Sequence, residues 1–259
     1  MRIVSLIKDI VRYREISERY GVGYEINDFF EPAVLDDENE IRRIIDEYKN
    51  AGIPNGSTMH GAFFDVLVHS RDKRIADIGK LRMRQCMEIA EELGVEAVVF
   101  HVNYQPGIPG DAYVKGVIDR TSEYLAELLV AYKDINVYIE NMFEDDVMVI
   151  KEIADRLSCY HNFGVCLDYA HAIVYGKGAD NWTETLSQYI RHVHINDNDL
   201  ITDLHLPVGS GRIDWEKFCS DREQYFPKAS ILIEVTNPEG QIASIEYLRG
   251  MTERRITYV

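Results

Sequence analysis

The stretch AEELGVEAVVFHVNY (residues 90–104) joins the end of a helical pattern to a short strand pattern. Gly94 stands between the two, and glycine just past a helical pattern commonly marks the end of a helix. The run AVVFH (97–101) is apolar up to its last residue, His101, as expected for a buried strand. The stretch therefore predicts a helix, then a buried strand, then a polar side chain where that strand ends.

The alternation of strand and helix patterns extends over the whole chain. Seven further apolar runs predict strands, at residues 3–7, 22–26, 56–60, 136–140, 163–168, 192–195 and 230–234. Longer segments of helical period predict helices at residues 36–52, 72–94, 112–133, 145–158, 181–190, 214–226 and 238–250. Strands that alternate with helices in this way favour an α/β fold, a (β/α)8 TIM barrel, over an open doubly wound sheet. We predict one such domain over residues 1–259.

Composition limits the classes of function. No apolar stretch approaches the roughly 20 residues that a membrane-spanning helix needs, and the first residues lack a signal-peptide pattern. We therefore expect no membrane partner and a cytoplasmic location. The four cysteines show no CxxC spacing, which is typical of buried thiols in a reducing compartment.

The charge balance bears on partners. A formal net charge of −16 argues against sequence-independent binding of nucleic acid over a broad surface, because such binding needs basic residues. The lysines and arginines within residues 71–84 are expected to form a solvated helix face. The sequence leaves open whether copies of the chain form a homo-oligomer.

Histidines and carboxylates recur at or just beyond the ends of the predicted strands. TIM barrels build their active sites at the carboxyl ends of the strands, so these side chains are expected to meet. Nitrogen and carboxylate oxygen together suit zinc, manganese or a similar divalent ion. The predicted metal ligands are His60, His101, Glu140, Asp168, His171, His194, Asp203, His205 and Glu234.

These segments resemble a known family. MHGAFFD, AEELGVEAVVFHVNY, CLDYAHA, and HINDND followed by DLHLPVGSGRIDW are similar to segments of the xylose-isomerase-like barrels. That family holds sugar and sugar-phosphate isomerases and epimerases, and also endonuclease IV. The resemblance covers about residues 20 to 240 and implies a metal-dependent TIM-barrel enzyme.

Two branches of the family imply different metal contents. The epimerase-like members imply one ion, held by Glu140, Asp168, His194 and Glu234. Endonuclease IV implies up to three zinc ions. Its ligand set corresponds here to His60, His101 and Glu140, to the four residues just named, and to His171, Asp203 and His205.

The chain departs from both branches at the strand-seven loop. Leu204 stands where endonuclease IV has an arginine, and NDNDL (196–200) lacks the substrate-binding arginine of the ketohexose epimerases. His171, with its neighbours in the ring, is also a candidate for binding substrate. The predicted substrate contacts are His171, His101, His60, Glu25 and Tyr104.

Other polar residues have more ordinary interpretations. His192 is expected to pack in the core, whereas His69 and His161 are expected at the surface. Asp197 is a candidate for orienting His194 or the loop that follows it.

The leading hypothesis is a sugar or sugar-phosphate isomerase or epimerase that depends on one divalent ion, Zn²⁺ or Mn²⁺. Glu140 and Glu234 would exchange a proton from opposite sides of the substrate, through a metal-stabilised enediolate. The alternative is an endonuclease IV-like multi-zinc phosphoester hydrolase, acting on abasic DNA or a small phosphoester. A binding protein on the same barrel is a third hypothesis.

Overall fold

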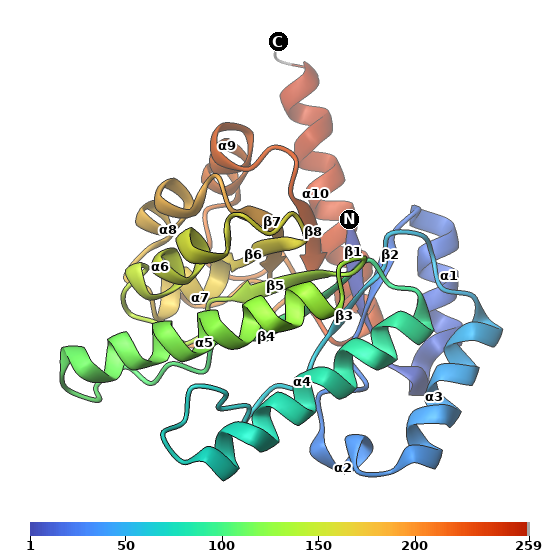
Figure 1. Ribbon diagram of the computed structural model, residues 1–259. Helices are drawn as coiled ribbons and strands as arrows, with labels where there is room; N and C mark the ends of the chain where they lie inside the picture. Colours follow the sequence, from blue (N-terminus) through green and yellow to red (C-terminus); the bar gives the residue numbers. More distant parts are fainter. Residues whose placement is uncertain (258–259) are drawn as a thin grey trace.

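The computed structural model describes residues 1–257, of which 1–253 with their side chains. Eight parallel strands close into a barrel in sequence order, and β1 pairs with both β2 and β8 (Figure 1). The predicted TIM barrel is therefore confirmed. The strands are β1 (Arg2–Ser5), β2 (Gly23–Ile26), β3 (Thr58–His60), β4 (Ala97–His101), β5 (Asn136–Glu140), β6 (Phe163–Asp168), β7 (Ile190–Ile195) and β8 (Ser230–Ile233).

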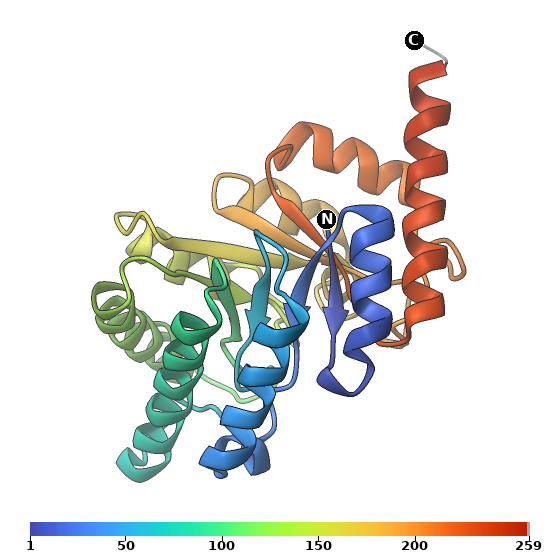
Figure 2. The same cartoon turned by 90° about the vertical axis from the view of Figure 1, so that its right-hand side faces the viewer.

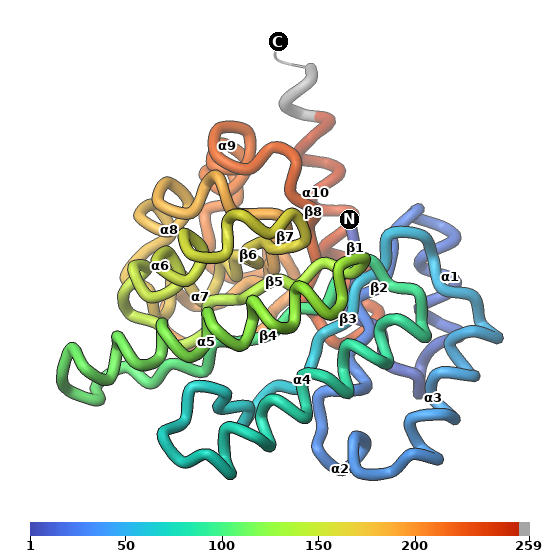
Figure 3. The backbone as a smooth tube through the Cα atoms, in the orientation of Figure 1, coloured from blue at the N-terminus to red at the C-terminus, as the bar shows by residue number. Residues whose placement is uncertain are grey.

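Helices connect the strands on the outside of the barrel, as the tube in Figure 3 traces from blue to red. No helix within residues 1–257 is both long enough and apolar enough to cross a membrane. The helices are η1 (Ile7–Asp9), α1 (Ile10–Tyr20), α2 (Pro32–Leu35), α3 (Glu38–Ala51), α4 (Lys73–Leu93), α5 (Asp111–Ala131), α6 (Met148–Leu157), α7 (Tyr169–Val174), α8 (Ala179–Leu186), α9 (Trp215–Tyr225) and α10 (Pro238–Thr257).

Three strand predictions, those of β4, β5 and β6, match the structure residue by residue. The first predicted strand, residues 3–7, extends past the end of β1 at Ser5. The strand ends there because the backbone N–H of Ile7 donates to Asp28 and the chain turns into η1. Glu234 lies one residue past β8 instead of at its end. Its N–H still donates to the carbonyl of Ile195 at 2.8 Å, so its position remains fixed by the sheet.

Helix α1 is absent from the predicted helices. Its buried face is formed by Tyr13, Ile16 and Tyr20, a helical spacing that charged residues interrupt. It ends at Gly21, whose φ of 66° is left-handed and suits glycine. Figure 2 shows α1, in blue, beside α10, in red, on the outside of the barrel.

The barrel interior has its own small apolar cluster. Ala97, Val99, Tyr138 and Cys166 contact one another there, separate from the main core between strands and helices. Strand side chains alternate in direction, so the residues two positions after Tyr138 and Cys166 also face inward. The packing inside the barrel therefore directs Glu140 and Asp168 to its carboxyl end, as the sequence analysis predicted.

Candidate metal centre

Four ligand-type side chains meet at the carboxyl end of the barrel. Glu140 on β5, Asp168 on β6, His194 on β7 and Glu234 after β8 form this inner group. Each offers one nitrogen or oxygen atom, and these atoms all lie within 4.8 Å of one another. The first three side chains are fully buried, whereas that of Glu234 is 13% exposed. Glu234 is thus the member of the group that a molecule from solvent can reach.

Glu140 also belongs to a second group, with His60 and His101. Its Oε2 atom lies 3.0 Å from His101 Nε2 and 3.3 Å from His60 Nε2. Its Oε1 atom lies 3.0 Å from His194 Nδ1. Both carboxylate oxygens are therefore shared, and Glu140 bridges the inner and second groups.

An outer group contains His171, Asp203 and His205. Oδ2 of Asp203 lies 3.1 Å from His171 Nε2 and 3.0 Å from His205 Nε2. His171 is on α7 and its side chain is 5% exposed, but Asp203 and His205 are on the loop between β7 and α9, with side chains 18% and 34% exposed. This group lies nearer to solvent than the other two.

The orientation of the histidine rings tests whether these groups suit a cation. A neutral imidazole that donates through Nδ1 presents a lone pair at Nε2. In three of the five predicted metal-ligand rings, Nε2 faces a carboxylate oxygen while Nδ1 faces a backbone carbonyl, so a proton or a cation is needed between the Nε2 and carboxylate lone pairs. Carbonyl partners at Nδ1 are typical of metal-binding histidines. Nδ1 lies 3.0 Å from a backbone carbonyl in each case, for His60 with Gly61, His171 with Asn141 and His205 with Glu234.

The inner group has carboxylate oxygens to offer. Oδ2 of Asp168 and Oε2 of Glu234 are buried and have no hydrogen-bond partner among the described residues. Burial raises the pKa of Asp168 well above its ordinary value; His171 opposes that shift, and the carboxylates of Glu234 and Glu140 reinforce it. A divalent cation would offset this cost, and the donor set suits Zn²⁺ or Mn²⁺. The residues therefore fit a metal centre.

Asp168 also sets the local backbone. Its Oδ1 atom accepts a hydrogen bond from the N–H of His171 at 2.6 Å and so caps α7. This leaves Oδ2 for the inner group. One short sequence, LDYAH, thus places a ligand-type side chain in the inner group and another in the outer group.

The loop that carries the outer group is tied to Asp197. Its carboxylate accepts from the N–H groups of Gly209 and Ile213 and from Nε1 of Trp215, at 2.8 to 3.1 Å. Asp197 therefore orders the loop, the second of its two predicted roles.

His205 has a φ of 47°, a left-handed conformation. This conformation costs about 1 kcal/mol for a residue other than glycine, and such residues cluster at functional sites.

Cys166 and His192 also lie close to His194. His192 is fully buried and both of its ring nitrogens have partners, Ser230 and Glu25, so it packs in the core as predicted. Burial lowers the pKa of His192 to about 4 and raises the pKa of the Cys166 thiol well above its usual value. These two residues therefore pack beneath the candidate metal centre, and we do not count them among its ligands.

A cavity of about 280 Å³ adjoins the inner group. Asn27, His60, Glu234 and Thr236 contribute its polar lining, and Phe63 covers one side. Phe63 packs on His101 with ring centroids 4.5 Å apart. Sequence reasoning missed Asn27, Phe63 and Thr236, because nothing in their spacing marks them. Within the described side chains, no lysine or arginine lines this cavity, and its size suits a small molecule.

Four of the five predicted substrate contacts do not line that cavity: His101 and His171, which belong to the second and outer groups, and also Tyr104 and Glu25. Tyr104 is buried and stacks on Tyr113, with ring centroids 5.6 Å apart. Glu25 is fully buried and contacts His192 and His194. The prediction that Tyr104 and Glu25 touch substrate therefore has no support from their positions.

His69 was predicted at the surface, and this was wrong. Its ring is buried and lies 3.2 Å from the carbonyl of Asn103 through Nε2. The loop after β3 folds over the loop after β4, and Arg120 donates to the His69 carbonyl to hold it there. His161 is exposed as predicted.

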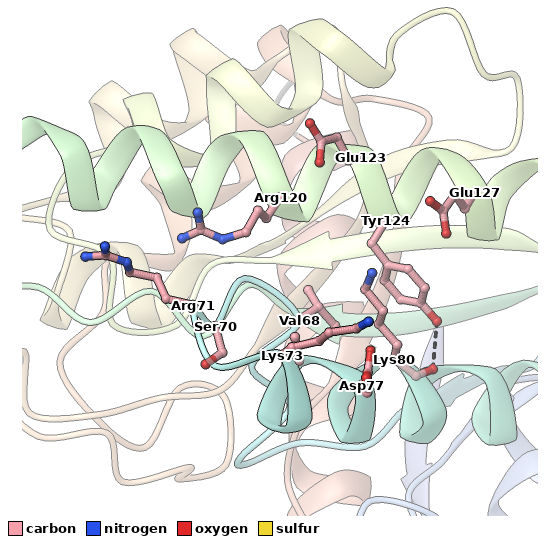
Figure 4. Close-up of a pocket in the computed structure, with 11 residues that line it drawn as sticks. Val68, Ser70, Arg71, Lys73, Asp77, Lys80, Arg120, Glu123, Tyr124 and Glu127 are labelled. Carbon is pink, nitrogen blue, oxygen red and sulfur yellow. Dashed lines mark hydrogen bonds between the residues drawn. The ribbon is translucent and has the colours of Figure 1, made fainter.

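A larger cavity, about 460 Å³, lies between α4 and α5 (Figure 4). Figure 4 shows Arg71, Lys73 and Arg120 around it, together with acidic residues such as Asp77 and Glu123. It contains none of the predicted metal ligands, and its charges are mixed. The perturbed and converging side chains at the strand ends make those ends the better candidate for the active site.

The family model of the xylose isomerase-like TIM barrel matches residues 21–251. The chain belongs to this family. The xylose isomerase-like fold spans every strand from β2 to β8 in that match, and with them all nine predicted metal ligands.

Among the relatives of this family member, the uncharacterized protein MJ1311 of Methanocaldococcus jannaschii is 28% identical over 210 residues, which are 75% of this chain and 69% of that protein. A protein of Halorhodospira halophila named Probable endonuclease 4 is 26% identical over 226 residues, which are 76% of this chain and 74% of that protein.

Solved structures share the fold over nearly the whole chain. A D-tagatose 3-epimerase-like protein has a TM-score of 0.76 at 23% identity, covering 97% of this chain and 96% of that one. The TTHB071 protein of Thermus thermophilus, soaked with ZnCl2, has a TM-score of 0.74 at 21% identity, covering 96% and 98%. D-psicose 3-epimerase of Clostridium cellulolyticum has a TM-score of 0.69 at 16% identity, covering 91% and 84%. At such identities the likeness establishes the fold, and several of these neighbours are sugar epimerases.

Proposed function

We propose that this protein is a divalent-metal-dependent isomerase or epimerase of a small sugar or sugar phosphate. The observation that carries the proposal is the inner group beside a small cavity, in which Glu234 alone is open to solvent. The sugar epimerases among the structural neighbours support the same class of substrate. Because no lysine or arginine among the residues that the structure describes lines the cavity, an unphosphorylated sugar fits it better than a phosphorylated one.

Glu140, Asp168, His194 and Glu234 would hold the ion. When bound, a divalent ion acts as a Lewis acid that draws electron density from a substrate oxygen and makes the neighbouring C–H more acidic. Glu234 lines the cavity and has an unpartnered carboxylate oxygen, so we assign it removal of the proton.

Glu140 is the second member of the proposed proton-transfer pair. Its carboxylate is shared by His60, His101 and His194, so it also holds these three rings in place. Nδ1 of His171 lies 3.9 Å from Oε1 of Glu140. We propose that the His171 ring orients a substrate hydroxyl. Phe63 and Phe30 give the cavity an apolar wall that excludes water from the exchanging proton.

The reaction can be tested without knowing the sugar. Proton transfer at carbon incorporates solvent deuterium, so a panel of ketoses and their phosphates in D₂O is followed by proton NMR. We expect the protein to exchange one C–H proton of at least one ketose. If no sugar exchanges while the protein carries its ion, the isomerase proposal fails.

Glu234→Gln removes the proposed base and one charged ligand together. We expect the exchange rate to fall by about 10³-fold while the far-UV circular dichroism spectrum is unchanged. Glu239→Gln, on the exposed first turn of α10, is the matched control and is expected to keep full activity. Activity near the wild-type level in Glu234→Gln would remove this residue from the mechanism.

A second candidate is a multi-zinc phosphoester hydrolase of small phosphoesters. The second and outer groups favour it, because nine ligand-type residues form three groups and Glu140 bridges two of them. The relative named Probable endonuclease 4 points the same way. The net charge of −16 weighs against DNA as its substrate.

Metal stoichiometry separates the two candidates. Elemental analysis is made on protein purified without chelator and without added metal. About one divalent ion per chain supports the isomerase. Two or three ions per chain, chiefly zinc, would make the hydrolase the first candidate. Small phosphoesters and abasic DNA are then assayed first.

A further inference from the structure

A buried polar network lies under the inner group, toward the amino ends of the strands. Glu25 on β2 and His192 on β7 are both fully buried. Oε2 of Glu25 accepts a hydrogen bond from Thr58 Oγ1 at 2.8 Å and lies 3.2 Å from His192 Nε2. Its other oxygen, Oε1, lies 3.1 Å from Nε2 of His194. A carboxylate thus stands directly behind a predicted metal ligand.

The far end of this network fixes the tautomer of His192. Arg2 is buried and its Nη1 atom lies 3.3 Å from His192 Nδ1. The Ser230 hydroxyl lies 2.7 Å from Nδ1, nearer than the Ser230 carbonyl at 3.2 Å; because a guanidinium can only donate and the hydroxyl can donate as well, we assign Nδ1 as the acceptor. A fully buried imidazole beside a guanidinium stays neutral. His192 therefore carries its proton on Nε2 and donates it to Glu25.

Glu25 then has one oxygen left for His194. Thr58 and His192 fill Oε2, whereas Oε1 has no aligned hydrogen bond among the described residues and faces only the His194 ring. A buried carboxylate oxygen is costly to leave without a donor. Nε2 of His194, 3.1 Å away, likewise has no hydrogen-bond partner among the described residues, so it is the donor within reach of this oxygen. The proton of His194 is therefore drawn to Nε2, and the lone pair remains on Nδ1.

Nδ1 of His194 is the atom that faces the inner group. It lies 3.0 Å from Glu140 Oε1 and 3.7 Å from Glu234 Oε2. We infer that Glu25 is a positioning residue of the metal centre: it holds His194 in the Nε2–H tautomer, so that Nδ1 is free to bind the ion. This inference rests on the proposed metal dependence, and it replaces the predicted contact of Glu25 with substrate.

Glu25→Gln tests the inference with almost no change in side-chain size. The amide oxygen can still accept from Thr58 and His192, and the amide NH₂ group then points at His194. Two donors cannot face each other, so the proton of His194 moves to Nδ1 and blocks the metal-binding atom. We expect the apparent Kd for Zn²⁺, measured by competition with a chelator, to rise about 10- to 100-fold.

Glu144→Gln is the matched control. Glu144 is also a buried glutamate, and its carboxylate accepts from the N–H of Met142 instead of contacting His194. We expect this variant to bind Zn²⁺ as tightly as the wild type. Equal affinity in Glu25→Gln and the wild type would overturn the inference and leave the proposed function standing. A wild-type protein that binds no divalent ion would instead end the proposed function.

A second measurement does not depend on whether Glu25→Gln folds. Two-bond ¹H–¹⁵N correlation spectra of wild-type protein labelled with ¹⁵N-histidine and loaded with Zn²⁺ report the tautomer of each ring. The signal of His194 is assigned by its loss in His194→Asn. A proton on Nε2 of His194 supports the inference, and a proton on Nδ1 refutes it.

Discussion

The inner and outer groups of ligand-type residues differ in how the chain carries them. Asp168 and His194 are paired in the sheet register and are fully buried, so the barrel backbone fixes their separation. Asp203 and His205 are partly exposed and are held by loop contacts around Asp197. Backbone pairing in a closed barrel cannot shift without breaking several hydrogen bonds, whereas a loop can adjust at small cost. We therefore propose that the inner group provides the fixed metal-binding capacity and that the outer group decides the type of reaction.

The largest effect is expected where the groups join. In Glu140→Gln the side chain loses the charge that His60, His101 and His194 share. We expect the protein to purify nearly free of metal and turnover to fall by at least about 10³-fold. Elemental analysis and the deuterium-exchange assay measure the two effects, with Glu144→Gln as the control in the same region of the chain. Retention of a full complement of metal would show that the inner group does not need its shared carboxylate.

An intermediate effect is expected in the outer group. Asp203→Asn removes the anion between His171 and His205. If the inner group binds the one catalytic ion, metal content stays at about one per chain and turnover falls only about tenfold. The same two assays measure this. Loss of an ion from Asp203→Asn would contradict the preference for an isomerase over a hydrolase. The outer group would then be a metal site of a hydrolase.

The smallest effect concerns a buried carboxyl beside both groups. Burial raises the pKa of Glu144 from 4.5 to about 7. Because the folded-state pKa exceeds the unfolded one, the stability from neutral Glu144 is complete below about pH 4.5 and is lost as pH rises through 7. Glutamine carries no charge at any pH. In metal-free protein we expect Glu144→Gln to gain about 2 kcal/mol over wild type in free energy of unfolding between pH 5 and pH 8.

Urea unfolding of both proteins, with chelator present, measures that gain. Glu239→Gln, whose side chain is exposed, should show no such dependence on pH. A constant difference between Glu144→Gln and wild type across this range would mean that Glu144 is ionised in the folded protein already at pH 5.

Particular residues show which parts of the candidate site could be predicted from the sequence. His101, Glu140 and Asp168 were predictable because each ends a clear apolar run, and parallel strands of a barrel bring their carboxyl ends together. His69 was misjudged because its burial depends on how one loop folds over another. The cavity residues Asn27 and Phe63 carry no signal in their spacing, because loops bring them to the inner group from different parts of the chain.

Glu25 shows the limit most clearly. Its position near the end of a predicted strand suggested a contact with substrate, but its partners come from β3 and β7. Arg2 and His192 are 190 positions apart in the sequence and touch only because the barrel closes. No local pattern reports such a contact.

The sequence by itself determined the barrel, and it placed six of the nine ligand-type residues at or next to strand ends and three on the loops that follow, because hydrophobic period and strand alternation are local properties of the chain. Only the tertiary structure decided which of those residues share an atom, which stay open to solvent, and which partner each imidazole nitrogen faces. Those properties depend on distances between strands and loops far apart in sequence, and on burial that exists only once the barrel has closed.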